Sequence, residues 1–184
     1  MADGKYERLS RKLVRQGIVI DEYIDTMSTP NGLIEEWDFI DHKGAAAVVP
    51  VMDDGRILMV NQYRNALERK TIELPAGGLK SREEPMKEAA ARELEEETGY
   101  RCDDSDMEFL ISVRTTVAFC NEHIDIYLAR NLKPGTQNLD PDEFLNVKAY
   151  SVSELLNLIY AGKMEDGKTI AGILAYINKY SVKA

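Results

Sequence analysis

Only two cysteines, Cys102 and Cys120, occur in the sequence, which is too few for a disulfide framework or a cysteine-based zinc site. No apolar run approaches the roughly 20 residues that a membrane-spanning helix needs, and the first residues contain no apolar stretch typical of a secretory signal. Positive charge is also scarce, because 23 lysines and arginines stand against 32 aspartates and glutamates, for a formal net charge of −9. No basic patch of the kind that grips a nucleic-acid backbone stands out. We therefore expect a cytoplasmic protein with no nucleic-acid partner and no membrane partner.

The 184 residues, 44% hydrophobic and 30% charged, fit a soluble globular protein with a sizeable core. Near the start, residues 17–27 and 33–42 are β-prone and flank a turn. Residues 5–15 could form a helical turn or an irregular arm. We assign residues 1–43 to a small N-terminal β subdomain. A sheet of two or three strands is marginal by itself, so we expect this subdomain to pack on another body, such as a second subunit.

Residues 44–184 are predicted to form the main domain. Strands are expected at residues 45–52, 56–63, 70–74, 107–118, 124–130 and 144–150, and a long loop, a candidate functional segment, at residues 131–142. The first two strands are joined at Asp53-Asp54-Gly55, which predicts a hairpin. Two closing helices are predicted, one capped by Ser151 or Ser153 and the other spanning residues 169–180.

One stretch, residues 73–100, combines a strand end, a Gly-rich loop and a helix crowded with carboxylates, ELPAGGLKSREEPMKEAAARELEEETGY. Pro85 suits the first helical position, and Gly99 suits the residue just past the helix end. Ser81 and Glu84 have the spacing of a capping box. The sequence therefore marks both ends of this helix.

Three carboxylates, Glu93, Glu96 and Glu97, project from one face of this helix because they lie three and four residues apart. Like charges at that spacing destabilise a helix unless something offsets their repulsion. One remedy is a solvated face with counterions, which is the usual case for a run of glutamates. The other is a bound divalent cation such as Mg²⁺, which prefers carboxylate oxygens and keeps other positions for water and substrate phosphates.

These glutamates belong to a longer pattern of fixed spacing, formed by Gly78, Glu84, Arg92, Glu93, Glu96, Glu97 and Gly99. The pattern resembles the Nudix box of the Nudix hydrolases, which cleave nucleoside diphosphates linked to another group. All the defining Gly, Glu and Arg positions are filled, and only Tyr100 departs from the aliphatic residue that is more usual there. The resemblance implies an α/β protein with the Nudix fold, an α/β/α sandwich with a mixed sheet.

The resemblance also implies a set of ligands for Mg²⁺, with Mn²⁺ as an alternative: the carbonyl of Ala76 and the carboxylates of Glu93, Glu96 and Glu97. A second set would position the site: Glu73, Gly78, Glu84 and Arg92. For Glu73, support of a metal and pairing with a basic residue are equally open. Arg92 would orient a glutamate by ion pairing, and Glu84 would brace the loop.

Divalent ions offset the charge of a pyrophosphate and lower the pKa of a bound water, and a carboxylate can then take the proton of that water. Glu96 and Glu97 are candidates for this catalytic chemistry. In the ADP-ribose pyrophosphatase branch of the family, a glutamate on a later loop serves as the base, and Glu143 is the matching candidate. Its neighbours Asp140 and Asp142 compete with it, and an acidic loop is often only solvated.

Resemblance to the ADP-ribose pyrophosphatase branch extends over residues 17–156 and implies three substrate-binding residues. Arg64 ends a strand like the branch's Gln-Tyr-Arg strand, whose arginine reaches substrate phosphate; it could otherwise be a surface charge. Trp37 lies in a strand like the one whose tryptophan stacks on adenine across the dimer in eukaryotic ADP-sugar members, although a lone strand tryptophan is more often part of a core. Glu122 matches a glutamate at the end of a segment downstream of the box.

One departure weakens the ADP-ribose assignment. Residues 114–122 have neither the proline nor the glycine of the Ser-Pro-Gly-like segment that the branch usually carries, so a different sugar or a looser preference is open.

We predict a homodimeric, Mg²⁺-dependent hydrolase that cleaves the pyrophosphate linkage of ADP-ribose or a related nucleoside diphosphate sugar. The products would be AMP, or another nucleoside monophosphate, and a sugar phosphate. One alternative is a pyrophosphohydrolase for another nucleotide, such as a damaged nucleoside triphosphate or a dinucleoside polyphosphate. The other is a sensor that binds a nucleotide sugar without cleaving it.

Overall fold

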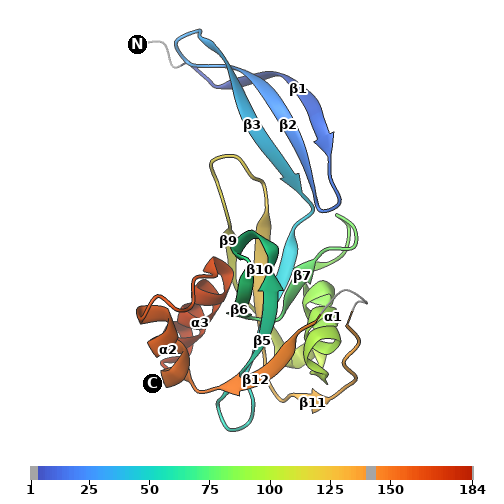
Figure 1. The fold of residues 1–184 in the computed structure, drawn as a ribbon, viewed down its shortest axis with the longest axis vertical. Helices are drawn as coiled ribbons and strands as arrows, with labels where there is room; N and C mark the ends of the chain where they lie inside the picture. Colours follow the sequence, from blue (N-terminus) through green and yellow to red (C-terminus); the bar gives the residue numbers. More distant parts are fainter. Residues whose placement is uncertain (1–3, 140–143, 184) are drawn as a thin grey trace. The chain divides into compact units, whose positions relative to one another are not determined.

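The computed structural model describes residues 4–139 and 144–183 (Figure 1). The chain divides into two units by its internal contacts. One unit contains residues 1–44 and 114–122, and the other contains residues 45–113 and 123–184. The first unit is therefore built from two segments that are far apart in the sequence. Of the helices in the described residues, none combines the length and the hydropathy that crossing a membrane requires.

The first unit contains an antiparallel sheet of order β1-β2-β3, formed by β1 (Glu7–Gln16), β2 (Ile20–Ser28) and β3 (Ile34–His42). The prediction of a helical turn or an irregular arm for residues 5–15 was wrong. β1 is exposed at every position, so its side chains have no apolar alternation, and backbone pairing with β2 makes it a strand. Residues 114–122 join the unit through a parallel bridge between Ile40 and Cys120.

Arg11 ties β1 to the rest of the sheet. Its Nε and Nη2 atoms donate to the two carboxylate oxygens of Asp25 on β2, both at 2.6 Å. Its guanidinium carbon lies 3.6 Å from the ring centre of Phe39 on β3, a cation–π arrangement. The hydrogen bond from Arg11 lowers the pKa of the buried Asp25 carboxyl, although burial acts in the opposite direction. A charged pair of this kind fixes the register of an otherwise solvated strand.

In the second unit, the described residues form three sheets. The first has the strand order β7 (Ala76–Gly78), β4 (Ala45–Pro50), β10 (His123–Ala129) and β9 (Met107–Arg114). The second has the order β12 (Asn146–Tyr150), β5 (Ile57–Arg64) and β6 (Arg69–Glu73), and the third pairs β11 (Lys133–Pro134) with β8 (Tyr100–Arg101). The four-stranded sheet is mixed, because β4 pairs with β10 in parallel and with β7 antiparallel. The predicted hairpin between β4 and β5 is confirmed by the antiparallel bridge between Val51 and Ile57.

Helices cover both faces of the central strand β4, whose residues are all buried. Ala46 and Val48 pack against α1 (Met86–Thr98). Ala47 and Val49 lie in the other core cluster, with residues of α2 (Val152–Tyr160) and α3 (Gly167–Tyr180). Successive side chains of a strand point to opposite faces, so α1 covers one face while α2 and α3 cover the other (Figure 1). The predicted α/β/α sandwich with a mixed sheet is confirmed.

The helix ends differ in part from the prediction. Pro85 is the N-cap of α1 and not its first helical residue, while Gly99 ends the helix with a φ of 72° as predicted. Ser81 does not cap α1, because its hydroxyl accepts from the backbone N–H of Glu83. The carboxylate of Glu84 accepts from the backbone N–H of Lys80. Pro85 itself is extended, with a ψ of 130°, so the helix begins only at Met86, five positions after Ser81.

The two closing helices have caps of their own. Ser151 caps α2 through a full capping box with Glu154, which settles the choice between Ser151 and Ser153. The helix predicted at residues 169–180 begins earlier, at Gly167, because Asp166 accepts from the backbone N–H of Thr169 and caps α3. Both helices pack their apolar stripes on the sheet.

Several predicted strands and loops also end at other residues. The strand predicted at residues 107–118 stops at Arg114, where the chain turns into the first unit. The strand predicted at residues 144–150 begins only at Asn146. Within the long loop predicted at residues 131–142, Lys133–Pro134 form the short strand β11.

Candidate active site

The Gly-rich loop and helix α1 meet at two carboxylates. The backbone N–H of Ala76 donates to Oε2 of Glu97 at 2.9 Å. A Cβ atom added to Gly77 would stand 2.1 Å from Oε1 of Glu93, so only glycine leaves room for that carboxylate. Glu93 and Glu97 are buried, 8% and 2% exposed. The strand end and the helix therefore hold both glutamates against the loop backbone.

Arg92 gathers the other acidic residues of the predicted box. Its Nη1 atom donates to Glu93 and, at 2.9 Å, to Oε2 of Glu96, while Nε donates to Oε1 of Glu84 at 3.1 Å. Nη2 donates to the carbonyl oxygen of Gly78 at 3.3 Å. Burial acts to lower the pKa of Arg92, but the bonds to Glu84 and Glu96 and the charge of Glu93 raise it above its usual value. One fixed cation therefore orients three carboxylates and the loop.

Glu84 occupies the position predicted for a brace. Partial burial of its carboxyl favours a higher pKa, but the N–H of Lys80 and the guanidinium of Arg92 bond to it and lower that pKa. The carboxylate therefore stays charged and bridges the loop to the helix. The predicted positions of Gly78, Glu84 and Arg92 thus come together in space.

The C-terminal end of α1 is held by residues 135–138 of the loop that follows β11. Gln137 donates from Nε2 to the carbonyl oxygen of Glu97 at 2.7 Å. The backbone N–H of Asn138 donates to the carbonyl oxygen of Glu96 at 2.9 Å. The N–H of Gly135 donates to the carbonyl oxygen of Gly99 at 2.8 Å. These carbonyls have no partner within a helix. The loop therefore supplies their hydrogen bonds and fixes the helix end that carries the glutamates.

A second cluster surrounds Glu73 at the end of β6. Arg64 donates from Nε and Nη2 to the two carboxylate oxygens of Glu73, at 2.7 and 2.6 Å. Thr71 donates from its hydroxyl at 2.6 Å, and Lys168 of α3 donates from Nζ at 2.5 Å. Burial raises the pKa of Glu73, but these partners outweigh burial and bring the pKa to about 2. Of the two predicted roles of Glu73, metal support and pairing with a basic residue, the structure shows the pairing.

Arg64 links this cluster to the helix. The bond to Glu73 raises the pKa of Arg64, burial opposes that shift, and the charges of Glu73, Asp166 and Glu97 add to it. The charge of Glu97 on α1 thus also favours the charged form of Arg64. The Arg64 side chain is 40% exposed, so one side of it faces solvent.

The donor set at the loop and helix fits a hard divalent cation. Among residues 4–139 and 144–183, no three His, Cys, Asp or Glu side chains form a cluster that could hold a metal ion. Glu93 and Glu96 bond to Arg92, while Glu97 bonds to the loop. Glu93, Glu96 and Glu97 nevertheless carry carboxylate oxygens, which such ions prefer. The space that Gly77 leaves beside Glu93 is a cradle that any other side chain would fill.

Trp37 and Glu122 belong to the first unit. Trp37 on β3 is 44% exposed, so it is not a core residue. Its ring lies 5.7 Å from that of Tyr6, centre to centre. Glu122 accepts from the hydroxyl of Thr115 at 2.6 Å and lies 3.5 Å from Nδ1 of His42.

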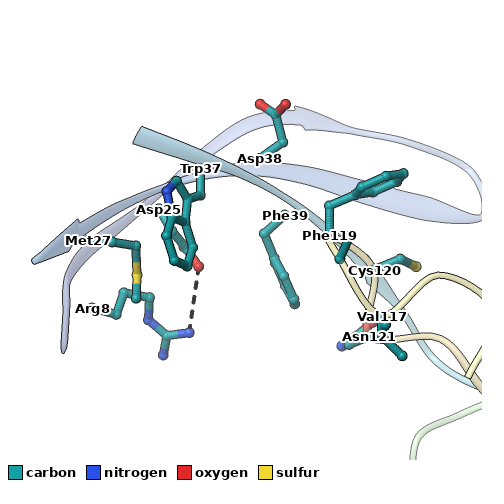
Figure 2. Close-up of a pocket in the computed structure, with 11 residues that line it drawn as sticks. Arg8, Asp25, Met27, Trp37, Asp38, Phe39, Val117, Phe119, Cys120 and Asn121 are labelled. Atoms are coloured by element: carbon teal, nitrogen blue, oxygen red, sulfur yellow. Dashed lines mark ion pairs between the residues drawn. The ribbon is translucent and has the colours of Figure 1, made fainter. Parts of the chain in front are cut away.

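A pocket of about 230 Å³ lies beside Trp37 within the first unit. Figure 2 shows Trp37 and Phe39 from β3, Phe119 from the segment 114–122, and an ion pair between Arg8 and Asp25. The wall thus combines aromatic rings with charged groups, a lining that suits a flat ligand with polar edges.

Glu143, the predicted base, and its neighbours Asp140 and Asp142 lie outside the described residues. Lys168, Thr71 and Gln137 were not predicted, although they contact predicted residues. Lys168 lies 95 positions from Glu73, and no local pattern in the sequence marks such a partner.

A NUDIX domain model matches residues 41–172 of the chain. The chain belongs to the Nudix hydrolase family. It is 38% identical to the methanol dehydrogenase activator of Bacillus methanolicus, over 85% of this chain and 84% of that one. It is 36% identical to the ADP-ribose pyrophosphatase of Bacillus subtilis, over 90% and 89% of the two chains.

A solved structure of an ADP compounds hydrolase supports the fold. It is similar with a TM-score of 0.84 and 19% identity, covering 96% of this chain and 95% of that one. The expected family and fold of this Nudix hydrolase are thus confirmed. Members of the family generally need a divalent metal, in accord with the oxygen donors at α1. The roles of single residues stay predictions.

Proposed function

We propose that this Nudix hydrolase cleaves the pyrophosphate linkage of ADP-ribose or a related nucleoside diphosphate sugar. The products from ADP-ribose are AMP and ribose 5-phosphate. The observation that carries the proposal is the seating of Glu97 and Glu93 against the backbone of Ala76 and Gly77, because it brings two carboxylates from one face of α1 to the same loop. The similarity to the ADP-ribose pyrophosphatase of Bacillus subtilis supports the substrate class.

In this proposal Mg²⁺, for which Mn²⁺ can substitute, is held by the carbonyl of Ala76 and the carboxylates of Glu93, Glu96 and Glu97. When bound, such ions neutralise charge on the pyrophosphate and lower the pKa of a water. Arg92 keeps Glu93 and Glu96 in place through its hydrogen bonds. Glu84 and Gly78 bind the same guanidinium and so brace the loop.

The proton of the attacking water passes to a carboxylate oxygen. Glu96 and Glu97 are the candidates within the described residues, and Glu143, which lies outside them, is the third candidate. Arg64 binds a substrate phosphate through its guanidinium, which is 40% exposed and whose planar fork matches phosphate oxygens. Without substrate, Nε and Nη2 of that fork donate to Glu73.

We assign Trp37 to stacking on the adenine and Glu122 to substrate binding, both from the first unit of a homodimer. The exposed ring of Trp37 and the pocket beside it support the first assignment. We further propose a cytoplasmic location, with a small nucleotide as the substrate and no nucleic-acid or membrane partner.

A substrate panel tests the function. Purified protein with Mg²⁺ is incubated with ADP-ribose, other nucleoside diphosphate sugars, nucleoside triphosphates and a dinucleoside polyphosphate, and the products are separated by chromatography. We expect AMP and ribose 5-phosphate from ADP-ribose at the highest kcat/KM among the classes. Preference for a triphosphate or a dinucleoside polyphosphate would move the assignment to that class. Tight binding of ADP-ribose without any hydrolysis would identify a sensor.

Two variants of α1 locate the chemistry. Glu97→Gln keeps an oxygen that can accept from the N–H of Ala76, so the fold should persist while turnover falls by about 100-fold or more. Glu88→Gln, an exposed glutamate on the same helix, is the matched control and should retain normal turnover. Near-normal turnover of Glu97→Gln would remove Glu97 from the site.

The relative from Bacillus methanolicus favours a second candidate, activation of an alcohol dehydrogenase. The test adds this protein, or its Glu97→Gln variant, to purified methanol dehydrogenase and follows methanol oxidation. Acceleration by the normal protein and not by the variant would show that activation depends on hydrolysis. No acceleration by either would reject this candidate.

A further inference from the structure

Glu73 has two cationic partners that differ in their environment. The Glu73 side chain is 3% exposed, Lys168 is 10% exposed and Arg64 is 40% exposed. Lys168 therefore sits inside the protein with the carboxylate, while Arg64 lies at the edge of the cluster with one side in solvent. Both cations bond to the same oxygen, Oε2 of Glu73, at 2.5 and 2.6 Å.

The first turn of α3 holds Lys168 in this place. Its Nζ atom also donates to Oδ2 of Asp166 at 2.9 Å, and Asp166 caps the helix by accepting from the N–H of Thr169. The hydroxyl of Thr169, which is fully buried, accepts from the N–H of Leu74 at 2.9 Å. The start of α3 is therefore pinned to the strand end that continues into Ala76.

A ligand phosphate at Arg64 would compete with Glu73 for the guanidinium. A buried carboxylate that loses its only cation is strongly destabilised, because the desolvation cost is no longer offset. With Lys168 and Thr71 still bonded to it, Glu73 keeps a counter-charge when Arg64 shifts. The charge of Lys168 would therefore lower the free-energy cost of moving Arg64 from Glu73 to a ligand phosphate.

We infer that Lys168 is a positioning residue for phosphate binding: it is the permanent counter-ion of Glu73, and it thereby frees Arg64 to bind the pyrophosphate of the substrate. This inference rests on the proposed function, in which Arg64 contacts substrate phosphate. It assigns a role in substrate affinity to the start of α3, far from the glutamate helix in the sequence.

The first test replaces Lys168 by an uncharged chain of similar length. In Lys168→Met, Arg64 stays on Glu73, so KM for ADP-ribose should rise about 10-fold while kcat changes by less than about threefold. Lys179→Met is the matched control, because Lys179 is on the same helix but pairs with Glu108 at the surface; it should leave both constants unchanged. Lys168→Arg keeps the charge and should restore KM to within about threefold of the normal value.

The same substitution in a Glu73→Gln variant separates the proposed role of Lys168 from a contribution to packing alone. In Glu73→Gln no carboxylate holds Arg64, so adding Lys168→Met to Glu73→Gln should leave KM unchanged. A rise of the same size in both backgrounds, or no rise in the single variant, would overturn the inference. Thermal melting of each variant checks folding, and the comparison within the Glu73→Gln background stays valid if Lys168→Met alone fails to fold.

Arg64→Ala separates a failure of the phosphate contact from a failure of the role of Lys168. If Arg64→Ala leaves KM unchanged, the phosphate contact of the proposed function fails, and the role of Lys168 fails with it. If Arg64→Ala raises KM and Lys168→Met does not, only the role of Lys168 fails.

Discussion

Gly77 and Glu93 form the tightest contact between the loop and the glutamate helix. The carboxylate of Glu93 occupies the space that a side chain at position 77 would need. The glutamate run marked the helix in the sequence, but the contact with Gly77 was not predictable from it, since their approach depends on how β7 and α1 pack. The same holds for Glu73, whose partners come from β5, β6 and α3.

Gly77→Ala should inactivate the enzyme without unfolding it. The added Cβ would stand 2.1 Å from Oε1 of Glu93, and that carboxylate is the end of a flexible side chain that can move aside. Displacing a site group by about 1 Å can cost about 100-fold in rate, so we expect a loss of kcat of that order with a nearly unchanged melting temperature. Gly167→Ala is the control, because its Cβ would meet no atom within 4 Å. Full activity of Gly77→Ala would mean that Glu93 is not needed where it lies.

The charge of Glu73 should make the protein acid-sensitive. Its pKa is about 2 in the folded protein and 4.5 as the ordinary value, so the unfolded chain binds one more proton between these values. The contribution of Glu73 to the free energy of unfolding is therefore fully present above pH 4.5. It is lost as the pH falls towards 2, and the total loss is about 3 kcal/mol. Urea unfolding at several pH values measures this slope. Glu73→Gln should flatten it, whereas Glu83→Gln, which removes an exposed carboxylate, controls for net charge; equal slopes in all three would contradict the expectation.

The elements of the second unit were largely predictable, because each has a local cause. β4 is an apolar run that is buried on both faces, Gly99 ends α1, and Ser151 begins α2. The failures also have physical reasons. β1 is exposed at every position, so no buried face marks it as a strand. The conformation of the loop after β11 depends on its hydrogen bonds to the end of α1, and no property of the loop residues alone reveals these bonds.

Gln137→Ala tests whether that loop supports the helix. The substitution removes the hydrogen bond to the carbonyl oxygen of Glu97, so the free energy of unfolding should fall by about 1 kcal/mol. Turnover should fall as well, since the end of α1 carries Glu96 and Glu97. Thr136→Ala is the control, because the bond from Thr136 to Glu95 comes from its backbone N–H. If both variants unfold at the same denaturant concentration as the normal protein, the side chain of Gln137 contributes nothing measurable.

For the molecule as a whole, the family pattern predicted the fold, while the division into units needed the structure. Residues 114–122 sit next to β9 in the sequence but join the first unit through Ile40 and Cys120. Their composition is not that of a linker. The segment lines the pocket beside Trp37 with Phe119 and its neighbours, so any ligand at Trp37 would meet both segments of the first unit.

Trp37 offers a direct test of the base-binding assignment, because it is the sole tryptophan and its fluorescence reports on one position. Titration with ADP should quench that emission with a single saturating curve. Base stacking on an aromatic ring is worth about 1–3 kcal/mol, so Trp37→Ala should raise KM for ADP-ribose about 10-fold or more with little change in kcat. Stability should hardly change, since the ring is 44% exposed.

Tyr160→Ala, at a ring that is 78% exposed on α2, is the control for loss of a surface aromatic. An unquenched emission together with an unchanged KM would leave Trp37 only its packing against Tyr6, and the adenine would have to bind elsewhere.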